Sequence, residues 1–300
     1  MPQTSSSGTP SKYASVLRPG LFAGEVHIVT GGGSGIGRCV AHELAALGAT
    51  VLLTGRTQEK LDKVAAEIRE DGGQADTFAF DIRDEDQVKA AVAQMVEKHG
   101  RIHGLVNNAG GQFPAPLQMI SKRGFDAVVT NNLTGGFLMA REVFNQSMQK
   151  HGGGAIVNMT ADMWNGMPGM GHSGAARAGM ANLTKTAAFE WSVANVRVNA
   201  VAPGWIASSG MDSYGPAMVG IINQLKHNVP MRRMGLEAEV SSVICFLLSP
   251  GAAFITGITV AIDGGAPLNS PVFPLADHAP STSFDGFHRA VTPKALQDNN

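Results

Sequence analysis

The chain has few cysteines, little net charge and no long apolar run, and each shortage excludes a class of protein. Its two cysteines, Cys39 and Cys245, lie far apart within expected helices, which favours packed thiols in a reducing compartment over a disulfide scaffold. The formal net charge of -1 gives no reason to expect nucleic acid or an anionic membrane as a partner. No apolar run reaches the length of a membrane span, and the opening residues "MPQTSSSGTPSKYA" lack the apolar core of a secretion signal. We therefore expect a cytoplasmic protein that binds no membrane.

Glycine, in contrast, is abundant, and the 37 glycines cluster at expected turns. Glycine at a turn indicates backbone that approaches a ligand closely, with tight packing as the alternative. A chain of 300 residues also has enough length to build a sizeable core.

Short apolar segments alternate with helical patterns along the chain. The expected strands are residues 25–30, 50–55, 76–81, 104–110 (with a turn), 154–160, 196–204 and 257–265. The expected helices are residues 38–48, 57–70, 85–100, 118–150, 171–193, 211–227 and 237–249. This alternation predicts an α/β fold in three layers, with a doubly wound parallel sheet of about seven strands covered on both faces. We expect one domain over residues 21–266, between a polar arm (1–20) and an irregular tail (267–300).

The string "TGGGSGIG", Thr30 to Gly37, lies between the first expected strand and the first expected helix. Gly31 would permit the tight turn, Gly35 would let the backbone approach a pyrophosphate, and Gly37 would let the helix pack closely. The helix N-terminus would then present free N–H groups and a positive dipole end to the phosphates. The candidate cofactor-binding residues here are Gly31, Gly33, Ser34, Gly35, Ile36 and Gly37. The alternative is an ordinary glycine-rich turn.

The second expected strand ends in "LLTGR", so that Arg56 stands where a carboxylate would select NADH. A guanidinium there can bind a 2′-phosphate, and such a charge-assisted contact contributes roughly 1.5–3 kcal/mol. The sequence therefore favours NADPH as the cofactor, and the alternative is a solvated surface arginine.

Five strings together resemble the short-chain dehydrogenase/reductase family: "TGGGSGIG", "NNAG" (107–110), "NNLTG" (131–135), "NAVAPG" (199–204) and "IDGG" (262–265). The resemblance covers residues 22–266 and implies a Rossmann-type, NADP-binding domain. Within the family, "RPGLFAGEVHIVTGG", "NNAGGQF", "HSGAARAGMANLTK" and "EVSSVICFLLSPGAAFITG" look closest to peroxisomal trans-2-enoyl-CoA reductases, and more distantly to 2,4-dienoyl-CoA reductases. By analogy, helices 118–150 and 174–193 would pair between the subunits of a homotetramer.

The resemblance also implies roles for single residues. The expected contacts are Asp81 and Ile82 with adenine, Asn108, Ala109 and Gly110 with the nicotinamide ribose, and Pro203, Gly204 and Ile206 with the carboxamide. Asn132 matches the helix asparagine of the proton relay, and its alternative role is a helix-kink or capping residue.

The usual catalytic side chains of the family are replaced. Ser173 stands at the tyrosine position and Arg177 at the lysine position, while Ala161 replaces the family's serine. The tyrosine that trans-2-enoyl-CoA reductases carry later in this helix is Ala181. The only tyrosines, at positions 13 and 214, match no catalytic position.

These replacements bear on the reaction, because reduction of a carbonyl must pass a proton to oxygen and a guanidinium does not give up its proton. Reduction of an α,β-unsaturated thioester needs a fixed donor for the thioester oxygen and a later proton at the α-carbon. We therefore expect NADPH-dependent reduction of a trans-2-enoyl-CoA, or a similar activated alkene, by hydride transfer to the β-carbon. The alternatives are a reductase of a carbonyl, enone or imine, and a non-catalytic NADPH-binding sensor or scaffold.

The candidate catalytic residues lie around the expected start of helix 171–193. Arg177 would hold the cofactor ribose, Ser173 would donate to the thioester oxygen, and Thr160, Asp162 and His172 would deliver a proton through water. The alternatives are a helix N-cap for Ser173, a loop histidine for His172 and a capping acid for Asp162. No metal is expected.

The segment after the sixth strand would cover the substrate. Its pliant apolar residues, Met211, Met218, Ile221 and Ile222, would line an acyl chain, with core packing as the alternative. Its basic residues, Lys226, His227, Arg232 and Arg233, would meet the phosphates of coenzyme A, with a solvated face as the alternative. The tail phenylalanines Phe273, Phe284 and Phe287 are too sparse for a core of their own, and we expect them to pack on a neighbouring subunit.

Overall fold

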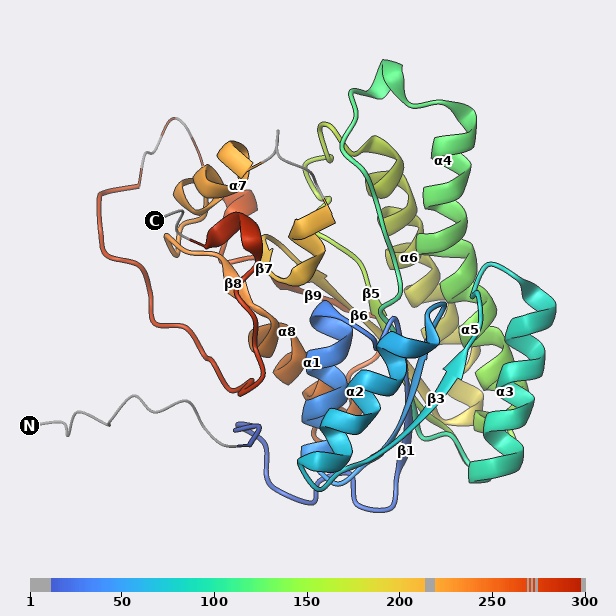
Figure 1. The fold of residues 1–300 in the computed structure, drawn as a ribbon. Coiled ribbons are helices and arrows are strands. Elements are labelled where there is room, and N and C mark those ends of the chain that lie inside the picture. Colours follow the sequence, from blue (N-terminus) through green and yellow to red (C-terminus); the bar gives the residue numbers. More distant parts are fainter. Residues whose placement is uncertain (1–11, 214–218, 269, 271, 273–274, 298–300) are drawn as a thin grey trace, which may run out of the picture.

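In the computed structural model, which describes residues 12–213, 219–268, 270, 272 and 275–297, seven parallel strands form one sheet (Figure 1). Their order is β3-β2-β1-β4-β5-β6-β9. The strands are β1 (Val26–Thr30), β2 (Thr50–Gly55), β3 (Gln74–Ala79), β4 (Gly104–Asn107), β5 (Gly154–Met159), β6 (Val196–Pro203) and β9 (Thr259–Ile262). A separate pair joins β7 (Ile206–Ala207) to β8 (Gly235–Leu236). The expected doubly wound parallel sheet is confirmed.

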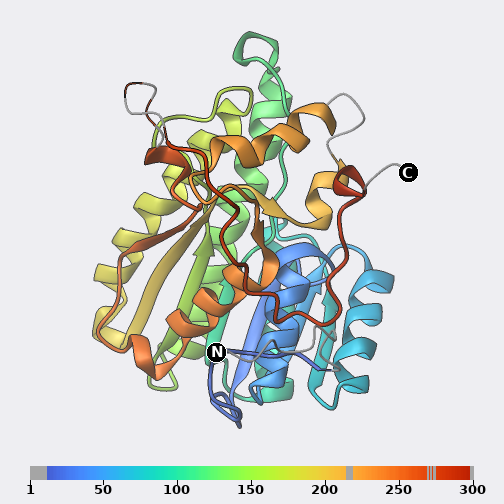
Figure 2. The same ribbon diagram turned by 90° about the vertical axis from the view of Figure 1, so that its left-hand side faces the viewer.

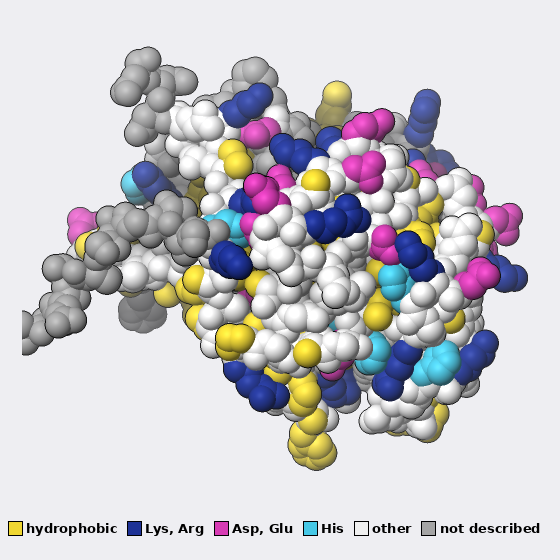
Figure 3. All heavy atoms as spheres, turned by 60° about the horizontal axis from the view of Figure 1, so that its bottom comes forward, with side chains coloured by type: hydrophobic (Ala, Val, Ile, Leu, Met, Phe, Trp, Pro, Cys, Tyr) yellow, Lys and Arg dark blue, Asp and Glu magenta, His cyan; other side chains and the backbone are white. Residues whose placement is uncertain are grey.

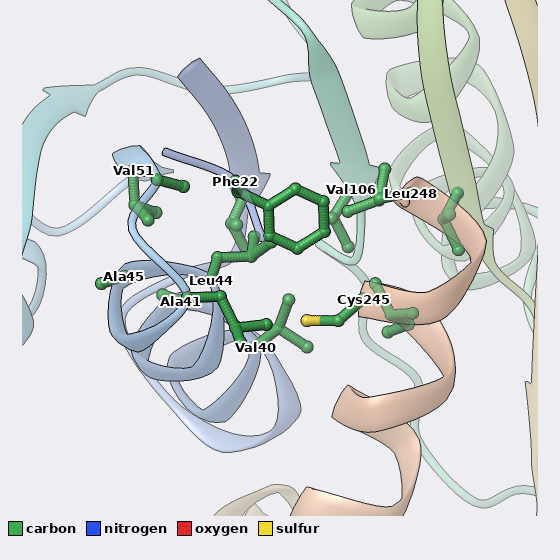
Figure 4. Close-up of a cluster of buried hydrophobic side chains, with 14 of the residues drawn as sticks. Phe22, Val40, Ala41, Leu44, Ala45, Val51, Val106, Cys245 and Leu248 are labelled. Carbon is green, nitrogen blue, oxygen red and sulfur yellow. The ribbon is translucent and has the colours of Figure 1, made fainter. Parts of the chain in front are cut away.

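Helices cover both faces of the sheet, which explains why the strands are apolar on both sides. One core lies between the sheet and helices α1 (Gly35–Ala46), α2 (Gln58–Glu70) and α8 (Glu237–Leu248). Figure 4 shows part of this core, in which Phe22 lies between Leu44 of α1 and Leu248 of α8. The other core lies against α3 (Glu85–His99), α5 (Gly135–Val143) and α6 (Gly171–Glu190). The three expected layers are therefore present.

The long helical region expected at 118–150 is interrupted rather than uniform. A short 3₁₀ turn (Leu117–Met119) precedes α4 (Lys122–Val129), and Ser121 caps α4 by accepting a hydrogen bond from the Gly124 N–H. Two π-helical turns, Thr130–Thr134 and Phe144–Met148, flank α5. These turns shift the side-chain register at single points, which apolar periodicity alone does not reveal.

Two other expected boundaries also differ. Helix α6 ends at Glu190, and a 3₁₀ turn and the left-handed Asn195 follow it before β6. The helix expected at 211–227 is divided into a 3₁₀ turn (Ser209–Ser213), α7 (Val219–Leu225) and a 3₁₀ turn (Lys226–Asn228), with residues 214–218 outside the described part.

The arm and the tail pack on their own chain, which corrects the expectation that the tail covers a neighbouring subunit. Phe287 is 3% exposed and packs with Tyr13, Cys39 and Ala238, and Phe284 lies at the edge of this cluster. The Ala14 N–H donates to the Gly286 carbonyl at 2.9 Å. A small core does form around these phenylalanines, because the arm and α8 supply apolar partners that the tail itself lacks. Phe273 lies outside the described residues.

The surface and the thiols agree with the composition. Figure 3 shows the face at the amino ends of the strands, where acidic and basic side chains are intermixed. Both cysteines are buried and unpaired, Cys39 in α1 and Cys245 in α8. None of the helices in the described ranges has the length and apolar content that a membrane crossing requires. Over the same ranges, histidine, cysteine and acidic side chains form no group that could hold a metal ion.

Candidate active site

A cleft of about 570 Å³ opens at the carboxyl ends of β1, β4, β5 and β6. Ligands of open α/β sheets bind at this edge, where the order of the strands reverses. Thirteen of the predicted site residues line this one cleft: Gly31, Ser34, Gly35, Ile36, Asn108, Ala109, Gly110, Thr160, Asp162, Arg177, Pro203, Gly204 and Ile206. Segments that are far apart in the sequence therefore meet around one space.

The glycine-rich turn leaves room beside the N-terminus of α1. Gly31 and Gly35 have φ angles of 66° and 57°, which side chains rarely adopt. A β-carbon on Gly37 would lie 2.4 Å from both the Gly31 carbonyl oxygen and Asn108 Nδ2, so α1 can lie this close only because Gly37 has no side chain. Ser34, the N-cap residue, makes no capping hydrogen bond with its side chain. The first N–H groups of α1 thus border the cleft, as binding of a phosphate requires.

The turn after β1 is joined to the end of β4 by hydrogen bonds. Thr30 Oγ1 donates to the Val106 carbonyl at 3.2 Å and accepts from the Asn108 and Ala109 N–H groups at 3.0 and 2.9 Å. Asn108 Nδ2 donates in return to the Thr30 carbonyl at 2.9 Å. This reciprocal set fixes the floor of the cleft before any ligand binds.

Asn132 holds the loop that follows β4. Its side chain is 2% exposed, accepts from the Gly111 N–H at 2.8 Å and donates to the Gly111 carbonyl at 2.9 Å. The side chain lies outside the cleft lining. Asn132 lies in the π-helical turn Thr130–Thr134, and its amide positions the loop that follows β4. Its part in a proton relay stays a prediction.

Arg177 places a buried positive charge at the cleft. It is 8% exposed, and its Nη1 donates to the Met159 carbonyl at 2.6 Å. A β-carbon on Gly110 would lie 2.6 Å from Nη2, so the guanidinium lies against the loop after β4.

Buried polar contacts fix the helix that carries Arg177. Asn107 Nδ2 donates to Asn158 Oδ1, and Asn158 Nδ2 donates to Thr184 Oγ1, both at 2.9 Å. Because these bonds join β4, β5 and α6, they hold the guanidinium against the carboxyl end of the sheet.

Ser173, predicted to donate to the thioester oxygen, and His172, predicted to deliver a proton through water, both lie behind the cleft wall. Both are 0% exposed and outside the cleft lining. Ser173 Oγ donates to Gln112 Oε1 at 2.5 Å. The His172 ring meets Phe113 edge-on at 4.5 Å between centroids, and its Nε2 has no hydrogen-bond partner among the described residues.

Gln112, which the sequence reasoning missed, lines the cleft in front of Ser173. The feature of the sequence that could have pointed to Gln112 is its position two residues after "NNAG", inside the string "NNAGGQF".

Thr160 and Asp162 both line the cleft, but they differ in whether they can give a proton to a ligand. Thr160 Oγ1 donates to the Val201 carbonyl at 2.8 Å, so its proton points into the backbone rather than toward a ligand. Asp162 is the only acid among the described lining residues. Burial, with the nearby charge of Asp263, raises the pKa of the Asp162 carboxyl. Asp162 therefore keeps its proton to higher pH than an exposed aspartic acid does.

The remaining predicted cofactor residues lie outside the cleft lining, at the ends of β1, β2 and β3. Arg56 is exposed, and its charge helps to lower the pKa of Asp81. Asp81 accepts two hydrogen bonds from Arg83 Nε at 2.9 and 3.0 Å, which is the main cause of that lowering. Ile82 is 6% exposed and packs against Gly135, while Gly33 faces Lys60 of α2. Of these residues, Arg56 is exposed and Asp81 is half-buried.

The predicted substrate cover is present only in part. Met211 lines the cleft, whereas Ile222 is 2% exposed and packs behind it, in agreement with the core-packing alternative. Met218, Tyr214 and the side chain of Ile221 lie outside the described residues.

The basic residues of this region divide into two groups. Arg233 donates to both carboxylate oxygens of Glu239, at 2.8 and 2.7 Å, so its guanidinium is held in an ion pair within the chain. Arg232 Nη1 donates to the His227 carbonyl at 2.9 Å. Lys226 and His227 have exposed side chains.

Comparison with known proteins relates this geometry to chemistry. A family model described as "Enoyl-(Acyl carrier protein) reductase" matches residues 31–267. A protein of Bacillus subtilis (strain 168) named "Probable 2,4-dienoyl-CoA reductase" is 36% identical over 248 residues, which are 81% of this chain and 96% of that protein.

Two solved structures add to the comparison. The "citronellol catabolism dehydrogenase (AtuB)" of Pseudomonas aeruginosa PAO1 is 61% identical, with a TM-score of 0.77, over 85% of this chain and 99% of that chain. A protein of Beutenbergia cavernae solved with bound NADP at low occupancy is 31% identical, with a TM-score of 0.78, over 84% and 100% of the two chains.

Proposed function

Since the chain belongs to the enoyl-(acyl carrier protein) reductase family of short-chain dehydrogenases/reductases, and is thus an oxidoreductase with a nicotinamide cofactor, we propose that it reduces the α,β double bond of an enoyl-CoA with NADPH. One observation carries the proposal. The cleft contains a fixed guanidinium, Arg177, and a protonatable carboxyl, Asp162, and its described lining residues include neither tyrosine nor lysine.

The residues at the cleft fit a dinucleotide. A β-carbon at Gly31 or Gly37 would collide with the Asn108 loop, and the N-terminus of α1 has no side-chain cap. These features match a site for pyrophosphate. We propose that Arg56, exposed beyond the end of β2, binds the 2′-phosphate and so selects NADPH over NADH. When bound, the cofactor supplies the hydride.

Arg177 and Asp162 have separate roles in this proposal. Arg177 holds the nicotinamide ribose and adds positive potential where negative charge collects on the substrate's thioester oxygen. Asp162 donates the proton that the α-carbon needs, and its raised pKa favours the protonated form relative to an exposed aspartic acid. Asn132 positions the loop that follows β4. Reduction of a ketone in this family typically uses a tyrosine to pass a proton to oxygen, and the described lining residues of the cleft include none.

The relatives favour a coenzyme A thioester with a methyl-branched acyl chain. The 36% identical relative is named as a dienoyl-CoA reductase. The 61% identical structure is named for the catabolism of citronellol, an acyclic alcohol with methyl branches. Met211, a pliant side chain in the cleft wall, suits such an irregular chain. We propose that the exposed Lys226 and His227 meet the phosphates of coenzyme A.

The test is oxidation of NADPH by the purified protein, followed by the loss of absorbance of the reduced nicotinamide. Linear and methyl-branched trans-2-enoyl-CoA substrates should be turned over, with the branched series preferred. The saturated acyl-CoA product is identified by mass spectrometry. Binding of NADPH without turnover of any enoyl-CoA would overturn the proposal.

A second candidate function has its own support, because the 61% identical structure is named a dehydrogenase. A branched alcohol with NADP⁺, and ketones, enones or imines with NADPH, form the second arm of the assay. Turnover only in that arm would favour this alternative, and no turnover in either arm would favour a non-catalytic NADPH-binding protein.

We also propose a homotetramer, by analogy with the family. Phe125 on α4 and Phe137 on α5 are 38% and 37% exposed, on helices that pair between subunits in relatives. Light scattering after size-exclusion chromatography should give four times the mass of the chain. A monomer at micromolar concentration would refute the analogy.

A further inference from the structure

The tail from 275 to 297 is attached to the body of the molecule at several points. Figure 2 shows the tail, in red, crossing the face formed by α8 and α1 before it reaches the turn at 294–296. Arg233 Nε donates to the Ser281 carbonyl at 3.1 Å, and the Phe284 N–H donates to Glu239 Oε1 at 3.2 Å. These contacts fix the first part of the tail beside β8 and the start of α8.

The middle of the tail is held more firmly. The Phe287 ring is buried, and the guanidinium of Arg38 lies 5.1 Å from its centroid. Arg289 donates to both carboxylate oxygens of Asp71, from Nε at 3.0 Å and from Nη2 at 2.6 Å. Arg38 Nη1 donates to the Arg289 carbonyl at 3.0 Å. The tail is therefore anchored to α1 and to the end of α2 before its last turn.

The last turn, Lys294–Leu296, contacts the segment that covers one side of the cleft. We call this segment the cover, and its described elements are the turn Ser209–Ser213, α7 and the turn Lys226–Asn228. The Lys294 N–H donates to Asp212 Oδ1 at 2.8 Å. Ala295 and Leu296 pack against a cluster that contains Met211, Ile222 and Leu225. Met211 also lines the cleft, and so does Trp205, which packs against the same cluster. Leu296 thus packs against the cluster that supplies part of the cleft wall.

The cover needs this support because its own elements are short. Helix α7 has 7 residues and the turn Ser209–Ser213 has 5. Helices of this length are not stable in water by themselves and depend on tertiary packing. On the side away from the cleft, the tail supplies part of that packing.

We propose that Leu296 is a specificity-determining residue that acts through Met211: by supporting the cover, the tail sets the length and branching of the acyl chain that the cleft accepts. This inference rests on the proposed function, and it assigns to the C-terminal tail a part in the choice of substrate.

The experiment compares Leu296→Ala with Val291→Ala, a matched truncation in the same tail at a side chain that is 65% exposed. In Leu296→Ala, KM for medium-length branched enoyl-CoA should rise about 5–10-fold, since a packed apolar group is lost behind the wall. In the same variant, the ratio of kcat/KM for longer acyl chains to kcat/KM for shorter ones should rise. The Kd for NADPH should change less than about twofold, because the glycine-rich turn is untouched. Val291→Ala should match the wild type.

Hydrogen exchange separates the failure of this inference from the failure of the proposed function. Backbone amides of α7 should exchange about tenfold faster in Leu296→Ala and at the wild-type rate in Val291→Ala, whatever the substrate. Unchanged exchange in Leu296→Ala overturns the inference even if enoyl-CoA is turned over. Faster exchange with an unaltered chain-length profile overturns the claim about specificity. If the wild type turns over no enoyl-CoA, the chain-length profile is measured with whichever other acceptor the wild type does turn over. Circular dichroism and the melting temperature establish that both variants are folded.

Discussion

Replacing Asp162 with asparagine removes the only acid among the described lining residues of the cleft and leaves the size of the side chain nearly unchanged. If Asp162 protonates the α-carbon, kcat should fall about 10²–10⁴-fold, the usual contribution of a positioned general acid. The Kd for NADPH should stay within about threefold, because the glycine-rich turn and Arg177 are intact. Stopped-flow measurement of a single turnover isolates the chemical step from product release.

The pH profile supplies a stricter test of the same reasoning. Burial and the charge of Asp263 raise the pKa of Asp162, so Asp162 stays protonated to higher pH and loses its proton as pH rises through that pKa. In the wild type, the rate should therefore decline on the alkaline side. Asp263→Asn removes the neighbouring charge, and it can keep the oxygen that accepts from the Gly265 N–H at 2.8 Å. This variant should move the decline to lower pH.

Asp162→Asn should show no such decline at its low residual rate. Two results would refute the assignment. One is an Asp162→Asn enzyme with more than about a tenth of the wild-type kcat. The other is an Asp263→Asn enzyme whose alkaline limb does not move or moves to higher pH.

Three further predictions concern the cofactor end of the cleft. Arg56→Gln should raise the Kd for NADPH about 10–100-fold and leave the Kd for NADH unchanged. Lys63→Gln on α2 is the control. Equal losses of affinity for both cofactors in fluorescence titrations would argue against a 2′-phosphate contact. Gly37→Ala should lower the free energy of unfolding in urea by about 1–3 kcal/mol, because its β-carbon would lie 2.4 Å from two atoms. Gly220→Ala, whose β-carbon would meet no atom of the described residues within 4 Å, should be neutral or stabilising. Burial raises the pKa of Glu237 to about 7, and this carboxyl lies near Gly35 at the N-terminus of α1. Its ionisation as pH rises through about 7 should therefore weaken NADPH binding, measured by calorimetry, and Glu237→Gln should bind NADPH with a weaker pH dependence. A wild-type Kd for NADPH that does not change across this pH range contradicts the reasoning.

The order of strands and helices could be predicted because it depends on local pattern. Apolar segments alternating with helical periodicity predict a parallel sheet with two covered faces, and the glycine spacing predicts the turn between β1 and α1. The same argument brings residues that follow β1, β4, β5 and β6 to one edge of the sheet, which is why most predicted cleft residues do line it. The π-helical turn before α5 was missed, because one inserted residue does not alter the apolar pattern enough to be seen.

What each polar side chain faces could not be predicted in this way. Ser173 and Gln112 are far apart in the sequence, and only the folded chain shows that one donates to the other and that Gln112 takes the place at the cleft. The same holds for Asn132, which is bound to Gly111. The tail was expected to need a neighbouring subunit because its own residues are too few for a core. The folded chain instead supplies Tyr13 and Ala238 as partners for Phe287.

The sequence by itself determined where the chain turns and which faces of its elements are apolar, because φ angles and periodicity depend on neighbouring residues. Tertiary structure decided which side chains reach the cleft and which pKa values shift. Those properties arise from burial and from charges such as Asp263 beside Asp162, which come together only when distant segments pack.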